Sequence, residues 1–194
     1  MAAENQANTA LGFHDFKWGT RILLAIFFLI STSPLLGAQE EVNNEYELKM
    51  AFLYNFAQFV EWPADAFRDS AAPFTICVAG DNPFLGRIEE SIRRRTVNGH
   101  AVELRSLNVD GDPHSCQMIF VRATEKRETL RVLASSKGSA ILTVGEADGF
   151  AERGGIINLT REENRLRFEV NINAAAQTRL KFSSKLLALA KIVK

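Results

Sequence analysis

The sequence predicts a single α/β domain, and three observations indicate this fold class. Short β-branched and apolar runs alternate along the chain with segments of helical periodicity. Two further strand patterns flank a polar turn and predict a β-hairpin, and an apolar helical pattern follows them. Neither an internal repeat nor a low-complexity linker divides the 194 residues. We therefore expect a mixed, mostly parallel sheet with packed helices and a C-terminal antiparallel hairpin plus helix.

The first periodic segment, residues 46–62, predicts a helix that is rich in aromatic residues. Its apolar side chains gather on one broad face, and Pro63 disfavours helical geometry at Trp62. Lys49 projects toward the apolar face and Tyr54 toward the polar side. In the simpler interpretation, Lys49 extends its ammonium group to solvent and Tyr54 covers the helix edge. The alternative is that Tyr54 and Trp62 form a partner-binding edge.

The elements after this helix are predicted from strand and turn patterns. The strands cover residues 74–79 (FTICVA), 101–107, 116–121 and 140–144, with helices near 84–95 and 125–135. Four glycines in residues 145–155 indicate a loop with unusual backbone requirements. Residues 156–160 and 165–172 form the expected hairpin. Asn173 or Ser183 can cap one or two helices in the last segment.

The N-terminal segment has the pattern of a secretory signal peptide. Lys17 and Arg21 lead into the apolar run ILLAIFFLI at residues 22–30. This run is shorter than the about 20 apolar residues that a membrane-spanning helix needs. The alternative is an uncleaved anchor, because Leu35 and Leu36 extend the apolar stretch.

The expected organisation of the chain follows from this segment. Small residues precede Gln39, and we expect cleavage after Ala38. Residues 1–38 are then the signal peptide, residues 39–45 a flexible lead, and residues 46–194 the α/β domain. The mature protein is expected to work outside the cytoplasm.

Composition and motifs favour a binding or regulatory module over an enzyme. Lys plus Arg equals Asp plus Glu, 23 each, so no basic surplus indicates nucleic acid. His100 and His114 have no metal-ligand spacing with each other or with the cysteines. Nucleophile-elbow, zinc-helix and phosphate-loop motifs are absent from the sequence. We therefore expect no catalytic residue, cofactor or metal site.

Two cysteines, Cys77 and Cys116, fall in the first and third predicted strands. An even number of cysteines in an exported chain favours a disulfide. The alternative is two buried free thiols that behave as small hydrophobic side chains.

Several motifs, taken in order, resemble the YfiR-like periplasmic family. The resemblance begins with YELKMAFLYNF at residues 46–56 and FVEWP at 59–63, and continues with ICVAGDNPF at 76–84 and VNG at 97–99. It extends through ILTVGE at 141–146, GGIIN at 154–158, RFEVN at 167–171 and LKFSSKLL at 180–187. The family is named for a periplasmic repressor of a membrane-anchored diguanylate cyclase. Cys77 and Cys116 look like its cysteine pair, whereas a second pair that some members carry near the glycine loop is missing here.

The resemblance implies an α/β fold, a periplasmic location, a stabilising disulfide and a tendency to form homodimers. It also implies a regulatory binding protein that restrains a membrane-anchored signalling enzyme by binding its periplasmic portion. Tyr54 and Trp62 are then the candidate partner-binding residues. The alternative function is a periplasmic small-ligand sensor or binding protein.

Overall fold

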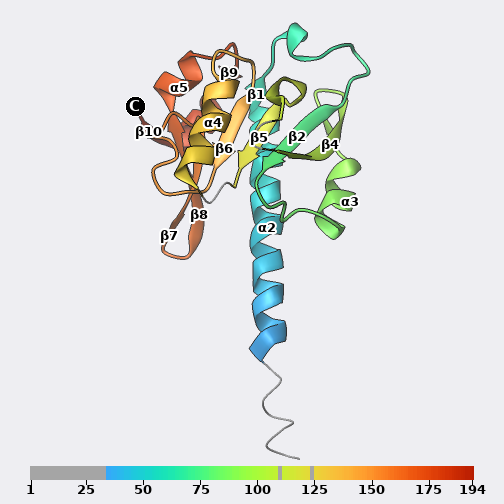
Figure 1. The fold of residues 1–194 in the computed structure, drawn as a ribbon, viewed down its shortest axis with the longest axis vertical. Helices are drawn as coiled ribbons and strands as arrows, with labels where there is room; N and C mark the ends of the chain where they lie inside the picture. The colour runs from blue at the N-terminus through green and yellow to red at the C-terminus, as the bar shows by residue number, and fades with distance from the viewer. Residues whose placement is uncertain (1–33, 109–110, 123–124) are drawn as a thin grey trace, which may run out of the picture. The chain divides into compact units, whose positions relative to one another are not determined.

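An eight-stranded mixed sheet organises the domain. Figure 1 shows how the strands and helices are arranged. The computed structural model describes residues 34–108, 111–122 and 125–194. The chain divides into two units, residues 1–44 and 45–194, and the sheet belongs to the second unit. The strands, in spatial order, are β10 (Lys191–Val193), β8 (Arg165–Asn171), β7 (Ile157–Glu162), β6 (Leu142–Gly145), β5 (Met118–Val121), β2 (Phe74–Ala79), β4 (His100–Leu107) and β3 (Thr96–Val97).

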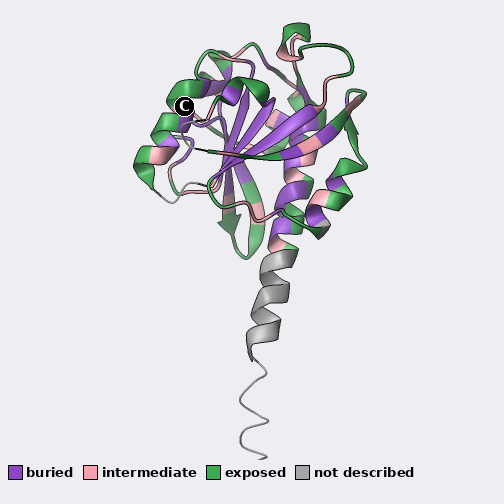
Figure 2. Ribbon diagram, turned by 45° about the vertical axis from the view of Figure 1, so that its right-hand side comes forward, coloured by how far each residue is buried: buried purple, intermediate pink, exposed green. Residues whose placement is uncertain are grey.

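The predicted fold class is confirmed. Strands β4, β2, β5, β6 and β7 are successive parallel neighbours. Strands β7 and β8 form the expected antiparallel hairpin, and the short strand β3 pairs antiparallel with β4. The central parallel strands β2 and β5 are short apolar runs because both of their faces are covered, and every residue of these two strands is buried (Figure 2).

Helix α2 (Pro34–Phe59) differs at both ends from the helix that the sequence predicts. It begins before Tyr46, so residues 39–45 belong to the helix. It ends before Trp62, because residues Val60–Glu61 form the short strand β1, which pairs antiparallel with β9 (Lys181–Phe182). Tertiary pairing therefore ends the helix earlier than the local effect of Pro63 would.

The sheet separates two groups of buried side chains. On one face, α2 and α3 (Arg87–Arg93) pack over a large core that includes Leu53, Phe56, Ile76 and Phe120. On the other face, α4 (Lys126–Ser136) covers a smaller core formed by Cys77, Ala79, Cys116, Ile119, Val121, Val132, Ile141 and Phe150. Helices on both faces of the sheet explain why the central strands β2 and β5 lack polar alternation, whereas β4 has polar residues and several exposed positions.

Phe150 explains the glycines of the loop between β6 and β7. Its ring is fully buried and lies against Gly145 and Gly155, where a Cβ atom at either glycine would collide with the ring. Gly149 and Gly154 have positive φ values of 68° and 98°. The predicted backbone role of these glycines is thus confirmed, and an aromatic side chain anchors the loop.

The C-terminal segment contains two short helices, and one expected cap is wrong. Helix α5 (Ile172–Ala176) is capped by Asn171, not Asn173, because the Asn171 side chain accepts a hydrogen bond from the Ala174 N–H at 2.8 Å. Ser183 caps α6 (Ser184–Leu189), as predicted. The chain then adds β10 beside β8, a strand that the sequence pattern did not indicate.

The structure contains the predicted disulfide between Cys77 and Cys116. Cys77 lies in the middle of β2, and Cys116 lies two residues before the neighbouring strand β5, with a Cα–Cα distance of 5.9 Å. Both residues are buried on the α4 side of the sheet. The bridge therefore connects β2 to the segment that leads into β5, across a sequence separation of 39 residues, and Cys116 lies outside β5, the strand in which the sequence predicts it.

We expect the loss of this disulfide to reduce the free energy of unfolding substantially. Closing a loop of this length corresponds to roughly 4 kcal/mol in the chain-entropy description. Urea unfolding of a Cys77→Ala, Cys116→Ala double variant measures this loss, and reduction of the wild-type protein should produce a similar decrease. Two freely reactive thiols in the native, unreduced protein would contradict the assignment.

Candidate functional site

The parallel sheet reverses its direction of growth beside β2. The chain passes from β2 to β4 on one side and then returns to form β5 on the other side of β2. In open parallel sheets, the carboxyl ends of the strands on either side of such a reversal form the usual binding edge. Strands β2 and β5 end here at Ala79 and Val121.

A group of charged side chains occupies this edge, and we call Glu45, Lys49, Arg122 and Glu146 the charge cluster. The ammonium group of Lys49 pairs with the carboxylates of Glu45 and Glu146, each at 2.5 Å. Arg122, which follows β5, pairs with Glu146 at 3.1 Å. Because Glu146 follows β6, the cluster connects α2 to the ends of two parallel strands.

Tyr46 completes the inner side of the charge cluster. Its hydroxyl accepts a hydrogen bond from Arg122 Nε at 2.9 Å, and its ring packs edge-on against Phe84. The cationic groups of Lys49 and Arg122 lie 4.5 Å and 5.0 Å from the centre of the same ring. Cations at these distances interact favourably with an aromatic ring.

The expectation that Lys49 extends its ammonium group to solvent is wrong. Lys49 is only 6% exposed, because its head meets the sheet edge, where two carboxylates stabilise its charge. Burial by itself would lower the pKa of Lys49, but the hydrogen bonds that Lys49 donates to Glu146 and Glu45 outweigh it, and the pKa is raised. The raised pKa keeps Lys49 as an ammonium ion, which acts as a structural cation between the two carboxylates.

A second feature is a groove lined by residues of α2 and α3, which we call the α2–α3 groove. It has a volume of 520 Å³. Met50, Ile88 and Ile92 are nearly inaccessible to solvent and provide its apolar surface. Polar and charged side chains at its margins include Glu47, Asn55, Ser91 and Arg95. An apolar surface bordered by polar groups is typical of a groove that receives a partner helix.

Tyr54 lies in the α2–α3 groove, whereas Trp62 does not line it. The Tyr54 hydroxyl donates a hydrogen bond to the Thr96 carbonyl at 3.1 Å, and the Arg95 guanidinium lies 5.3 Å from the Tyr54 ring centre. Trp62 donates a hydrogen bond to the Gln117 carbonyl at 3.2 Å and packs edge-on against Phe74. Both residues are half-buried, so each supports the fold and still presents part of its surface.

The charge cluster was missed by sequence reasoning. The only local signal was Lys49 on an apolar helix face, because Glu146 and Arg122 lie in separate strand-to-loop junctions far along the chain. The described residues hold no group of three or more His, Cys, Asp or Glu side chains placed to bind a metal ion. Among the helices that the structure describes, none has the length and apolar character that a membrane span requires.

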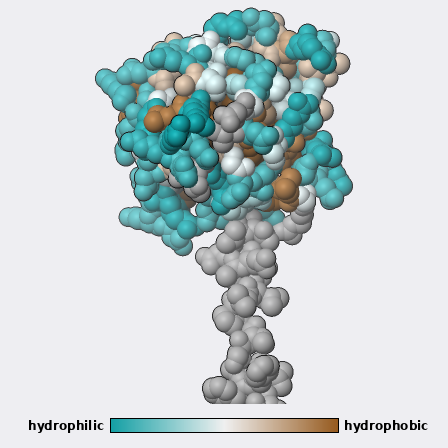
Figure 3. Space-filling model, in the orientation of Figure 1, coloured by the Kyte–Doolittle hydropathy of each residue, from teal (hydrophilic) through white to brown (hydrophobic). Residues whose placement is uncertain are grey.

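The outer surface of the domain is mainly hydrophilic on the face that Figure 3 presents, with apolar residues at separate places. The most exposed large apolar side chains among the described residues are Leu189, Leu85 and Leu48, at 74%, 63% and 48%. Leu48 is next to Glu47 of the α2–α3 groove in the sequence of α2.

Comparison with known protein families identifies the domain. A family model described as YfiR/HmsC-like matches residues 46–191. The match therefore includes most of the charge cluster, the whole α2–α3 groove and both cysteines.

We expect Lys49→Met to lower the free energy of unfolding by about 3 kcal/mol at pH 7, because it removes one partner of a buried ion pair. The cost should decrease as the pH falls. Lys49 lowers the pKa of Glu45. The stabilisation that the Lys49–Glu45 pair gives to the folded protein is therefore fully present above the ordinary pKa of a glutamate, and it is lost as the pH falls through the lowered pKa of Glu45. Urea unfolding of both proteins at pH 7 and pH 3 measures the difference.

The matched control for this measurement is Arg105→Met, which breaks the exposed pair between Arg105 and Glu103. That change should cost less than about 1 kcal/mol at pH 7. An equal cost of Lys49→Met at both pH values would show that Lys49 contributes through packing and not through its charge.

Proposed function

The chain belongs to the YfiR/HmsC-like family, and we propose that it restrains a membrane-anchored diguanylate cyclase by binding the periplasmic portion of that enzyme. Proteins of this family are periplasmic, regulatory and non-catalytic, and they are associated with membrane-anchored signalling partners. A match over residues 46–191 is the observation that carries the proposal, because it spans the whole sheet except the end of β10.

The α2–α3 groove is the proposed contact surface for this partner. It has an apolar floor with polar margins, and α2 residues Glu47 to Asn55 run along it for about 12 Å at 1.5 Å per residue. This length corresponds to about two turns of a bound helix. Tyr54 lies in the groove, and large aromatic residues are common anchors of binding energy in interfaces.

Restraint requires the protein to distinguish two states of its partner. A bound regulator shifts a conformational equilibrium only by its difference in affinity for the two states. In the proposed function, the groove binds the periplasmic portion of the cyclase more tightly in its inactive state. The output of cyclic-di-GMP then falls when the regulator is bound and rises when it is lost.

Ala51 offers a way to test the groove without removing a native contact. Its side chain is exposed and lines the groove, so Ala51→Glu places a charge at the proposed interface while the core stays intact. Ala176 is also an exposed helical alanine, but it lies in α5 outside the groove. Ala176→Glu is therefore a matched control with the same change in charge and size.

We expect deletion of the gene to raise cellular cyclic-di-GMP, and wild-type protein or Ala176→Glu to restore the low level. Ala51→Glu should fail to restore it, because a buried unpaired carboxylate weakens the interface by tenfold or more. Tyr54→Ala should weaken restraint as well, and Trp62→Ala reports whether the contact extends beyond the groove. Thermal unfolding of each purified variant separates lost binding from lost folding.

Unchanged cyclic-di-GMP after deletion, under several growth conditions, would contradict the proposed restraint. Full restoration by a stably folded Ala51→Glu variant would keep the restraint but place the contact surface elsewhere on the domain.

A further inference from the structure

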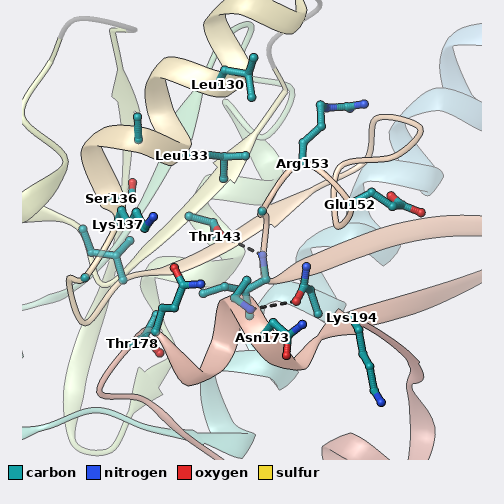
Figure 4. A pocket seen from close by; sticks show the side chains of 18 residues that line it. Leu130, Leu133, Ser136, Lys137, Thr143, Glu152, Arg153, Asn173, Thr178 and Lys194 are labelled. Carbon is teal, nitrogen blue, oxygen red and sulfur yellow. Dashed lines mark hydrogen bonds between the residues drawn. The ribbon is translucent and has the colours of Figure 1, made fainter.

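A cavity with a volume of 420 Å³ opens on the α4 side of the sheet, between α4 and α5 (Figure 4). We call it the α4–α5 cavity. Its volume falls in the range of about 300–1,000 Å³ that is typical of small-molecule sites. The α2–α3 groove lies on the other face of the sheet, so the two surfaces are separate.

The topology of the sheet explains why this cavity exists. The crossover from β2 to β4 contains α3, and the crossover from β5 to β6 contains α4. Strands β6 and β7 are also parallel neighbours, but their connection, residues 146–156, contains turns and no helix. The place where a crossover helix normally packs on the sheet is therefore only partly filled, by Phe150 and by the later helix α5.

The floor of the α4–α5 cavity is apolar and preformed. Ile141, Thr143 and Ile156 are each at most 4% exposed, and Leu133 approaches from α4. Figure 4 shows Leu133 and Thr143 facing the same space. The Thr143 hydroxyl accepts a hydrogen bond from the Ile156 N–H at 3.1 Å. Because that oxygen already has a partner, the floor offers mainly aliphatic surface to a ligand.

The rim of the cavity carries polar groups and an excess of positive charge. Three cationic side chains line it, Lys137, Arg153 and Lys194, against the single carboxylate side chain of Glu152. Among the described residues, none of these three cations has an ion pair, whereas nearby Lys191 pairs with Glu169 at 2.8 Å.

Two of the rim residues have hydrogen-bonding groups that the described protein leaves unused. The Nε atom of Arg153 is buried and has no hydrogen-bond partner among the described residues. Gln177 is exposed at the rim and makes no side-chain hydrogen bond within the same part of the chain. Lys137 follows directly at the C-terminal end of α4. Unpaired donors beside an apolar floor match a ligand that has an anionic end and an aliphatic body.

We propose that the α4–α5 cavity binds a small carboxylate with an aliphatic chain. The chain lies on Ile141, Ile156 and Leu133, and the carboxylate faces the rim, where Lys137 and Gln177 donate hydrogen bonds. This site goes beyond the proposed restraint of a partner, because it gives the domain a binding site for a small molecule on the face opposite the α2–α3 groove.

The test uses sodium hexanoate as the probe and the purified protein labelled at its Leu and Ile methyl groups. We expect hexanoate to shift the NMR signals of Leu133, Ile141 and Ile156, with saturation in the millimolar range. Hexylammonium, which has the same chain and the opposite charge, should shift these signals far less. Lys137→Glu should weaken hexanoate binding about tenfold or more.

The matched control is Lys126→Glu, which makes the same charge change on α4 at an exposed residue outside the cavity. It should change the hexanoate affinity by less than about twofold. Equal weakening by both variants, equal binding of hexylammonium, or no shift of the three residues at 20 mM hexanoate would overturn the proposal.

Discussion

The ion pairs of the buried Lys49 ammonium group are the interaction that joins helix α2 to the carboxyl edge of the sheet. It holds α2 to the carboxyl edge of the parallel sheet through Glu146, and Arg122 binds the other side of the same carboxylate. An ion pair at a site this enclosed is costly to form, so each charge needs more than one partner. The structure provides these partners from α2, from the end of β5 and from the end of β6. The position of α2 then determines one wall of the α2–α3 groove.

The sheet places two different surfaces on opposite faces of one small domain. On one face, α2 and α3 leave a groove with an apolar floor and polar margins, suited to a protein segment. On the other face, the connection without a helix between β6 and β7 leaves an open cavity with a buried apolar floor, suited to a small molecule. The disulfide lies between the two central strands β2 and β5, and its side chains belong to the core under α4. Any rearrangement of these strands would therefore reach both surfaces, because each surface rests on the same sheet.

The sequence predicted those features that local pattern determines. The β-branched run from Phe74 to Ala79, the hairpin and the Ser183 cap all follow from residues close together in the chain. Features that depend on contacts between residues far apart in the chain could not be predicted from local sequence patterns. The early end of α2 depends on the pairing of β1 with β9, and the buried position of Lys49 depends on Glu146, which lies 97 residues away. The α2–α3 groove and the α4–α5 cavity both result from how helices pack on the sheet. The periodicity of a single helix does not predict how it packs against other elements.

The central claim is that the domain contacts its membrane partner through the α2–α3 groove, and site-specific photocrosslinking tests it most directly. A benzoylphenylalanine residue is placed at position 51 in the groove, or at position 176 in α5, and the exported protein is irradiated in intact cells. The account predicts a covalent adduct with a membrane-anchored diguanylate cyclase from position 51 and none from position 176. An adduct with the cyclase from position 176 alone, while position 51 gives none and restraint of the cyclase persists, would contradict it.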